Sequence, residues 1–199
     1  MPLPSGATDK LGNRYEGKWT VNSMIEILSG RALTIRLEPL GPKGEGVEFW
    51  LQRTVDKREY HQVKRQHSEE GRWALSLLHS KKVLTHFRQK LCTDPSASCV
   101  FVSMYAAYQL KELADRARSA ASQREFREWC LVAKGQAANF EQLCHYWDKC
   151  TEQEAYEAIQ RIEVETISED TLRRMIECHL DLLMERESAS RNADDAATA

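Results

Sequence analysis

Three polar residues within the stretch Gly46–Gln66 have side chains that could do chemistry together: Glu48, Gln62 and Lys64. Two short segments in this stretch alternate apolar and polar residues and flank a polar turn, which predicts a β-hairpin. Side chains two positions apart on a strand share a face, so Gln62 and Lys64 point the same way and Val63 is buried behind them. Glu48 lies on the polar face of the first strand. Pairing of the strands would bring a carboxylate, an amide and an ammonium group to one patch.

These three groups match what the hydrolysis of a phosphodiester requires. A divalent metal neutralises the phosphate oxygens and lowers the pKa of a bound water. Mg²⁺ prefers hard oxygen ligands and keeps several waters, so a carboxylate from Glu48 and a carbonyl oxygen from Gln62 suffice to hold Mg²⁺, or Mn²⁺. Lys64 could orient the attacking water or stabilise charge at the phosphorus centre. Because Gln-x-Lys also occurs by chance on exposed strands, its meaning depends on the elements around it.

The chain before the hairpin predicts a helix and a strand. Residues 1–9 are expected to be a flexible leader, and the helix to begin near Asn13 and end at Ser29-Gly30. Helical spacing predicts a buried stripe of Val21, Met24, Ile25 and Leu28. Glu16 lies on a neighbouring face, from which it can reach the edge of the sheet, although an acid in a first helical turn is also favourable by itself. The alternation over residues 32–38 predicts a half-buried strand.

Helices and strands also alternate after the hairpin. A helix over 72–91 and a buried apolar strand over 99–104 complete a core over residues 10–105. Further helices are predicted over 106–120, 122–134, 137–147 and 151–160, an edge strand over 161–166 and a last helix over 169–187. Residues 106–187 are thus expected to be a largely helical extension packed on the core. Residues 188–199 are small and polar, which predicts a disordered tail or a linker.

The order of these elements, with an acid on one strand and Gln-x-Lys on the next, resembles the PD-(D/E)xK restriction-endonuclease-like superfamily. More closely, it resembles the double-stranded DNA nuclease domains at the N-terminus of bacterial antiphage defence proteins. The matching residues are Gly12 to Glu16 (GNRYE), Glu48 in GVEF, and Gln62 and Lys64 in HQVKRQ. The resemblance covers about residues 10–105 and implies an α/β fold in which helices flank a mixed sheet, with residues 10–105 as the nuclease core. Glu48 stands where the superfamily usually has Asp, and Gln62 where it usually has an acid. The neutral amide lowers the negative charge around a metal, so a domain that binds metal weakly, or that is inactive, remains an alternative.

The resemblance implies a metal-dependent endonuclease that cleaves DNA with little sequence specificity. It assigns catalytic roles to Glu16, Glu48, Gln62 and Lys64, and places Mg²⁺ or Mn²⁺ at Glu48 and Gln62. It further implies double-stranded DNA as the substrate, assembly into a homo-oligomer, and a role as the effector domain of an antiphage protein with a C-terminal NTPase or sensor domain. The residues themselves do not distinguish DNA from RNA.

Basic residues are concentrated in the first part of the chain. Residues 1–130 contain 21 Lys and Arg against 15 Asp and Glu, whereas residues 131–199 contain 7 against 15, within a net charge of only −2. A basic front of this kind is typical of a protein that meets a polyanion, and is also compatible with contact between the halves of a dimer. Candidate phosphate contacts near the predicted site are Lys43, Arg65, Lys81 and Lys82.

Composition disfavours several other classes of protein. The sequence has no apolar run of 18 residues and no apolar N-terminal segment, so neither a membrane span nor a secretory signal is predicted. Six irregularly spaced cysteines in 199 residues favour free thiols in a reducing cytoplasm. Cys144-His145, Cys150 and Cys178-His179 lack the spacing of structural zinc sites. The main alternative to a nuclease is a catalytically silent nucleic-acid-binding or oligomerisation module of a larger defence protein.

Overall fold

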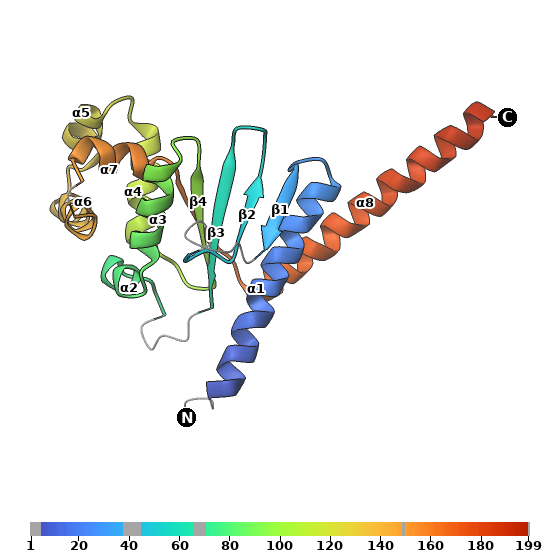
Figure 1. The fold of residues 1–199 in the computed structure, drawn as a ribbon, viewed down its shortest axis with the longest axis horizontal. Helices are drawn as coiled ribbons and strands as arrows, with labels where there is room; N and C mark the ends of the chain where they lie inside the picture. The colour runs from blue at the N-terminus through green and yellow to red at the C-terminus, as the bar shows by residue number, and fades with distance from the viewer. Residues whose placement is uncertain (1–4, 38–44, 66–70, 149, 199) are drawn as a thin grey trace.

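The computed structural model describes residues 5–37, 45–65, 71–148 and 150–198, and these form an α/β fold around a five-stranded mixed sheet. Figure 1 shows the sheet between two layers: α1 and α8 lie on one face, and α2 to α7 lie on the other. The strand order is β1-β2-β3-β4-β5. The first three strands are antiparallel neighbours, and the last two run parallel to β3. Their bounds are β1 Thr34–Leu37, β2 Phe49–Gln52, β3 Arg58–Lys64, β4 Ser98–Ser103 and β5 Ile162–Thr166.

Helices fill the connections between parallel strands, which need long crossovers where antiparallel strands need only hairpins. Between β3 and β4 lie α2 (Leu75–Ser80) and α3 (Val83–Thr93). Between β4 and β5 lie α4 (Tyr108–Ser119), α5 (Gln123–Glu125), the π-helix η1 (Phe126–Cys130), α6 (Lys134–Tyr146) and α7 (Glu152–Ile159). Outside the sheet, α1 (Ser5–Leu28) precedes the first strand and α8 (Glu169–Thr198) follows the last. The expected mixed sheet flanked by helices is therefore confirmed.

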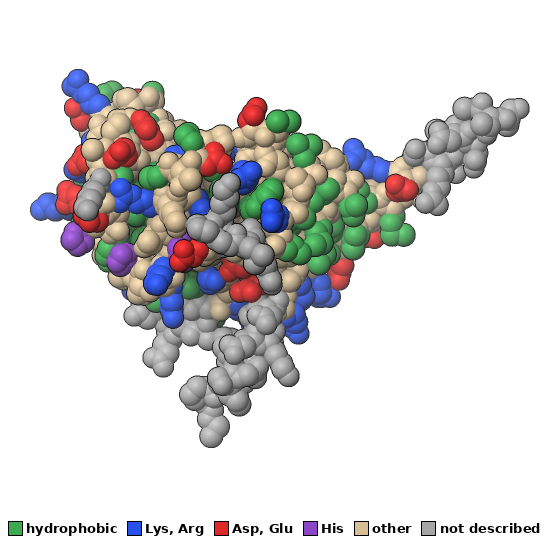
Figure 2. All heavy atoms as spheres, viewed as in Figure 1, with side chains coloured by type: hydrophobic (Ala, Val, Ile, Leu, Met, Phe, Trp, Pro, Cys, Tyr) green, Lys and Arg blue, Asp and Glu red, His purple; other side chains and the backbone are tan. Residues whose placement is uncertain are grey.

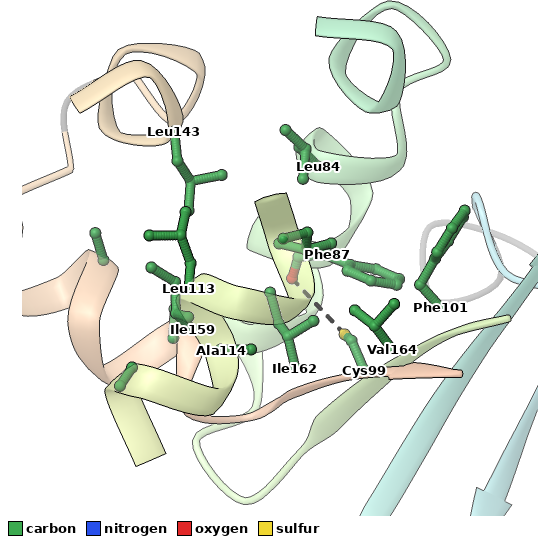
Figure 3. Packing of buried hydrophobic residues seen from close by; sticks show 14 of the residues in the cluster. Leu84, Phe87, Cys99, Phe101, Leu113, Ala114, Leu143, Ile159, Ile162 and Val164 are labelled. Atoms are coloured by element: carbon green, nitrogen blue, oxygen red, sulfur yellow. Dashed lines mark hydrogen bonds between the residues drawn. The ribbon is translucent and has the colours of Figure 1, made fainter. Parts of the chain in front are cut away.

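The larger apolar core lies between the sheet and helices α2 to α7. Figure 3 shows its centre, where Phe87 of α3 packs near Cys99 of β4 and Ile162 of β5. Every residue of β4 is buried, and this explains its apolar sequence, because a strand covered on both faces has no solvent side. Residues on both sides of position 105 contribute to this cluster. The segment 106–187 therefore completes a shared core and supplies the fifth strand of the sheet.

The smaller apolar core, beneath α1 and α8, corrects the predicted face of α1. Only Ile25 of the predicted stripe is buried, and the other three members are exposed: Val21, Met24 and Leu28. The helix instead buries Tyr15 and Trp19, which join Phe49 of β2 and Leu172 of α8 in one cluster. Large aromatic side chains gain much from burial, and this favours the orientation in which Tyr15 and Trp19 face the sheet.

Several predicted boundaries differ from those observed. The helix expected over 72–91 begins at Leu75 and is interrupted at Lys82, whose left-handed backbone (φ 60°) cannot continue an α-helix. Strand β1 is mostly exposed rather than half-buried, because it is the edge strand and few side chains cover it. The buried strand over 99–104 and the edge strand over 161–166 are confirmed as β4 and β5.

Both terminal helices are longer than predicted. Helix α1 begins at Ser5, inside the expected leader, and α8 continues to Thr198, through the expected tail. Residues 188–198 contain no Gly or Pro and four alanines, the residue with the highest helix propensity. The composition that suggests a flexible tail is thus equally suited to a helix. No helix in the described parts of the chain is long and apolar enough to cross a membrane.

Candidate functional site

The β2–β3 hairpin forms as predicted and brings its polar residues together. Phe49 pairs with His61, and the Glu48 amide donates to the His61 carbonyl oxygen at 3.0 Å. Glu48 therefore stands beside Gln62, where β2 begins and β3 ends. Phe49 and Val63 are fully buried on the opposite face, as the alternation of the sequence predicts.

Glu48 is hydrogen-bonded through both of its carboxylate oxygens. Lys64 Nζ donates to Oε1 at 2.6 Å, and the Val63 amide donates to Oε2 at 3.0 Å. The side chains of Lys64 and Glu48 are 34% and 21% exposed, so the ion pair is open to solvent. Two donors from β3 thus hold the carboxylate in one orientation at the end of the hairpin, which is the kind of support that a preorganised site requires.

Gln62 has the most unusual surroundings of the predicted site residues. Its side chain is 2% exposed, and Oε1 has no hydrogen-bond partner among the described residues. A buried carbonyl oxygen without a partner costs free energy. Because Gln62 is two positions from Lys64 on the same strand face, this oxygen lies on the face to which the Glu48–Lys64 pair belongs. A bound cation or a hydrogen-bond donor would satisfy this oxygen.

Helix α1 brings Glu16 close to the same cluster. Burial raises the pKa of Glu16 most, and the Glu48 carboxylate raises it further, while Lys64 lowers it in part. Influences of this kind weaken with distance, so Glu16 lies near both of these residues. Two carboxylates that share a site and disfavour each other's ionisation are common at functional centres. The structure therefore brings Glu16 near Glu48 and Lys64, while Gln62 is the neighbour of Glu48 in the strand register.

A neighbouring charge cluster could not be seen in the sequence. Glu169, in the first turn of α8, accepts hydrogen bonds from Arg14 Nε at 2.7 Å and from Lys18 Nζ at 2.9 Å. The hydrogen bond from Lys18 contributes most, and that from Arg14 adds to it. Together they hold the pKa of Glu169 below its usual value, although burial raises it. Tyr15 Oη donates to the Ile167 carbonyl oxygen at 2.9 Å in the same region. The cluster fixes α1 against the start of α8, and no short-range pattern signals a pairing over 150 residues.

The four candidate phosphate contacts differ in their surroundings. Lys81 and Lys82 are exposed where α2 meets α3. Arg65 is only 13% exposed, and its Nη2 lies 3.9 Å from Glu169. Arg65 is therefore less available to a phosphate than the two lysines. Lys43 lies outside the described residues.

His86 of α3 connects this basic flank to the start of β2. Burial lowers the pKa of His86, and Lys90, Lys82 and Lys64 lower it further against the opposing effect of Glu45. Lys82 therefore lies on the same side of the molecule as Lys64. Gly46, with a left-handed φ of 72°, allows the close approach, since a Cβ at this position would overlap the His86 imidazole.

The oxygen donors fit a hard divalent cation. Glu16 and Glu48 offer carboxylates, and the buried Gln62 Oε1 offers the neutral oxygen that lacks a partner; Mg²⁺ and Mn²⁺ accept such ligands. Within the described ranges, no three His, Cys, Asp or Glu side chains are grouped so that they could hold a metal ion. A metal here would therefore depend on the amide of Gln62, and the donor set is unsuited to Zn²⁺, which prefers nitrogen and sulfur ligands.

Comparisons with protein-family models, with curated proteins and with solved structures found no match for this chain. The fold and the site define an α/β protein that has a carboxylate, an amide and a lysine at the end of a central hairpin, and a second carboxylate, Glu16, on α1. Membership of the PD-(D/E)xK superfamily stays a prediction from the motif and the order of the elements.

Proposed function

We propose that this protein is a metal-dependent endonuclease that cleaves DNA phosphodiester bonds with little sequence specificity. The observation that carries the proposal is the junction at the end of the hairpin. There, Glu48 is held by Lys64 and by the Val63 amide, beside a buried Gln62 oxygen that has no partner in the described chain. An oriented carboxylate, an available neutral oxygen and an ammonium group within one cluster are the parts that phosphodiester hydrolysis requires.

Glu48 and Gln62 would hold the metal, and Glu16 would assist from α1. Bound Mg²⁺ or Mn²⁺ would supply charge neutralisation at the phosphate and a more acidic water. Lys64 donates to Glu48 from a partly exposed position, so an incoming phosphate oxygen would compete for the same ammonium group. The ammonium group would then stabilise the negative charge that builds on the phosphate in the transition state. The raised pKa of Glu16 makes this carboxylate a better proton acceptor than an ordinary one.

The exposed lysines favour contact with the nucleic-acid backbone rather than with the bases. Lys81 and Lys82 offer mobile point charges that bind phosphates without reading sequence. No structural feature of the described residues points to a helix or ribbon placed to enter a DNA groove. Double-stranded DNA as the substrate, and a role as the effector of an antiphage protein with a C-terminal NTPase or sensor domain, follow only from the resemblance of the motif.

The alternative is a catalytically silent nucleic-acid-binding or oligomerisation module. One observation favours it: both oxygens of Glu48 are already hydrogen-bonded, and an amide replaces the acid that would strengthen a metal site. In this case the Glu48–Lys64 pair would simply stabilise the end of the hairpin.

Plasmid cleavage separates the two functions. The protein is incubated with plasmid DNA in Mg²⁺, in Mn²⁺ and in EDTA, beside Lys64→Ala and the control Lys57→Ala, which removes an exposed lysine from the β2–β3 turn. An enzyme cuts only with metal, loses cutting in Lys64→Ala and keeps it in Lys57→Ala. DNA binding is measured separately in EDTA. Binding without metal-dependent cutting would support the silent module.

A further inference from the structure

A cleft that the proposed nuclease chemistry does not use lies between the sheet and the two terminal helices. Its volume is about 530 Å³, and it is lined by residues of α1, of α8 and of strands β3 to β5. His61 and Glu59 of β3 line it, and they alternate with Gln62, so the cleft is on the sheet face opposite Gln62. A ligand in this cleft would therefore occupy a separate site.

His61 presents a buried hydrogen-bond donor to this cleft. Its ring stacks on Phe49 with centroids 4.6 Å apart, and its Nδ1 accepts the indole N–H of Trp19 at 3.2 Å. When Nδ1 of a neutral imidazole accepts, Nε2 carries the proton. This Nε2 has no hydrogen-bond partner in the described residues, and the side chain is 2% exposed. Glu59 Oε2 lies 3.5 Å from Nε2, outside hydrogen-bonding geometry, and accepts from Arg53 at 2.7 Å. Although burial raises the pKa of Glu59, His61 and Arg53 together lower it below its usual value.

The opposite side of the cleft is acidic. The register places His61, Val100 and Glu163 in one row across β3, β4 and β5, with Glu165 in the next row. Glu163 and Glu165 are exposed and form no ion pair with the described residues. His61 and Glu163 are two strand spacings apart, about 9.5 Å. The side chain of Val100 lines the cleft between them.

The charged side chains that line the cleft indicate which kind of ligand it would bind. Four carboxylates line the cleft, from Glu26, Glu59, Glu163 and Glu165, against two guanidinium groups, from Arg31 and Arg53. Arg53 is paired with both Glu26 and Glu59, so the uncompensated negative charge lies on β5. A ligand therefore gains most if its cationic end faces β5 and an oxygen acceptor faces His61. A protonated Nε2 also excludes this nitrogen as a metal ligand.

We propose that this cleft binds a small organic cation that carries a carboxylate or carbonyl oxygen, of the size and chemistry of a basic amino acid. The oxygen accepts from His61 Nε2, the aliphatic part lies over Val100, and the cationic group pairs with Glu163 and Glu165. The cleft lies between α1, which carries Glu16, and α8, which carries Glu169, so a bound ligand would also link the two helices beside the proposed nuclease site.

Three probes of similar size separate the parts of the ligand. L-Arginine has both the side-chain cation and the carboxylate acceptor, agmatine lacks the carboxylate, and L-citrulline has a neutral urea in place of the cationic guanidinium. Calorimetric titration of the whole chain is expected to show binding of L-arginine, with agmatine and L-citrulline each about tenfold weaker or more, because each loses one charge-assisted interaction. Equal binding of all three, or no binding of L-arginine, would overturn the proposal.

Matched variants test the same site from the protein side. The double variant Glu163→Gln with Glu165→Gln changes only exposed residues, so the fold is retained, and it is expected to reduce L-arginine affinity at least tenfold. Glu141→Gln, on α6 and 66% exposed, is the control and keeps the affinity. In ¹⁵N spectra of the imidazole, His61 is expected to be the Nε2–H tautomer and to shift with L-arginine. An Nδ1–H tautomer, or unchanged affinity in the double variant, would refute the assignment.

Discussion

At the residue scale, Glu16 and Glu169 are two carboxylates near the site with opposite pKa shifts. Burial and Glu48 raise the pKa of Glu16 above its usual 4.5, whereas Lys18 and Arg14 lower that of Glu169. A raised pKa means that the folded state holds its proton more tightly, so the contribution of Glu16 to stability is lost as pH rises above 4.5. The contribution of Glu169 is present above 4.5 and is lost as pH falls through its lowered pKa.

Glu16→Gln is therefore expected to stabilise the protein at pH 7. Glutamine removes a charge that burial and Glu48 disfavour, and the gain disappears below pH 4, where Glu16 is protonated. The rise in Tm is a few degrees at most, since about 1 kcal/mol corresponds to about 2–4 °C for a domain of this size. Thermal unfolding across pH 3 to 8 measures it. A lower Tm for Glu16→Gln at pH 7 would show that Glu16 is favourably paired rather than strained.

Glu169→Gln is the matched opposite change. It removes a partly buried acceptor that holds Lys18 and Arg14, so it is expected to lower the stability at pH 7 by about 1 kcal/mol and to have little effect at pH 3. The same pH series of unfolding curves tests it. A loss of equal size at pH 3 and pH 7 would mean that packing, and not charge, accounts for the role of Glu169.

At the scale of elements, the link between the start of β2 and α3 depends on Gly46. Gly46→Ala is expected to destabilise the fold by about 2–4 kcal/mol, because the left-handed φ strains an alanine and the new Cβ overlaps His86. Denaturant unfolding measures the change. Adding His86→Ala should restore the part that comes from overlap and leave about 1 kcal/mol of backbone strain.

Gly17→Ala is the control for this substitution. Gly17 lies within α1, and a Cβ there meets no atom within 4 Å, so alanine is expected to stabilise the helix by up to about 1 kcal/mol. If Gly46→Ala were as harmless as Gly17→Ala, His86 and the start of β2 would not be in the contact described above.

The sequence predicted some elements well and others poorly, for physical reasons. Strict alternation defined the β2–β3 hairpin, and with it the shared face of Gln62 and Lys64, because a period of two leaves no other assignment. The face of α1 was wrong, since the aliphatic stripe competes with Tyr15 and Trp19 and only the sheet decides between them. The break at Lys82 carries no Gly or Pro to signal it.

At the scale of the molecule, the charge cluster at Glu169 and the cleft at His61 depend on contacts between α1 and α8. These helices are at opposite ends of the sequence, so no local pattern predicts that they meet. Glu16 was expected to reach the edge of the sheet from its place on the helix, and in the structure its pKa is influenced by Glu48 and Lys64. Whether the cluster binds metal stays a prediction.

Exposed apolar side chains gather where α1, β1 and α8 meet the surface, and Figure 2 shows a patch of hydrophobic atoms over this region. Its members are Val21, Met24, Leu28, Leu33, Leu37, Leu180, Leu182 and Met184. Contiguous exposed apolar surface often marks a contact site. An interface between two copies of one chain uses the same patch on both, so we expect this patch to pair with a second copy of the chain.

Light scattering after size exclusion tests this homodimer. Leu28→Asp combined with Leu182→Asp places charges at two highly exposed positions of the patch, and is expected to give monomers with little change in Tm. The control is Val132→Asp, which changes an equally exposed apolar residue outside α1, β1 and α8, and should leave the dimer intact. A wild-type chain that is monomeric at high concentration would contradict the expectation.

The most direct test of the central claim is Mn²⁺ binding, followed by electron paramagnetic resonance, in the wild type, Glu48→Gln and Gln62→Leu. If Glu48 and Gln62 form a metal site beside Lys64, the wild type binds Mn²⁺ and both variants lose about tenfold or more in affinity, while Glu141→Gln binds as the wild type does. Gln62→Glu should bind more tightly, because it adds an anionic oxygen. A wild type that binds no Mn²⁺, or binding that is the same in Glu48→Gln and Gln62→Leu, would contradict the account and leave the Glu48–Lys64 pair as a structural feature of the hairpin.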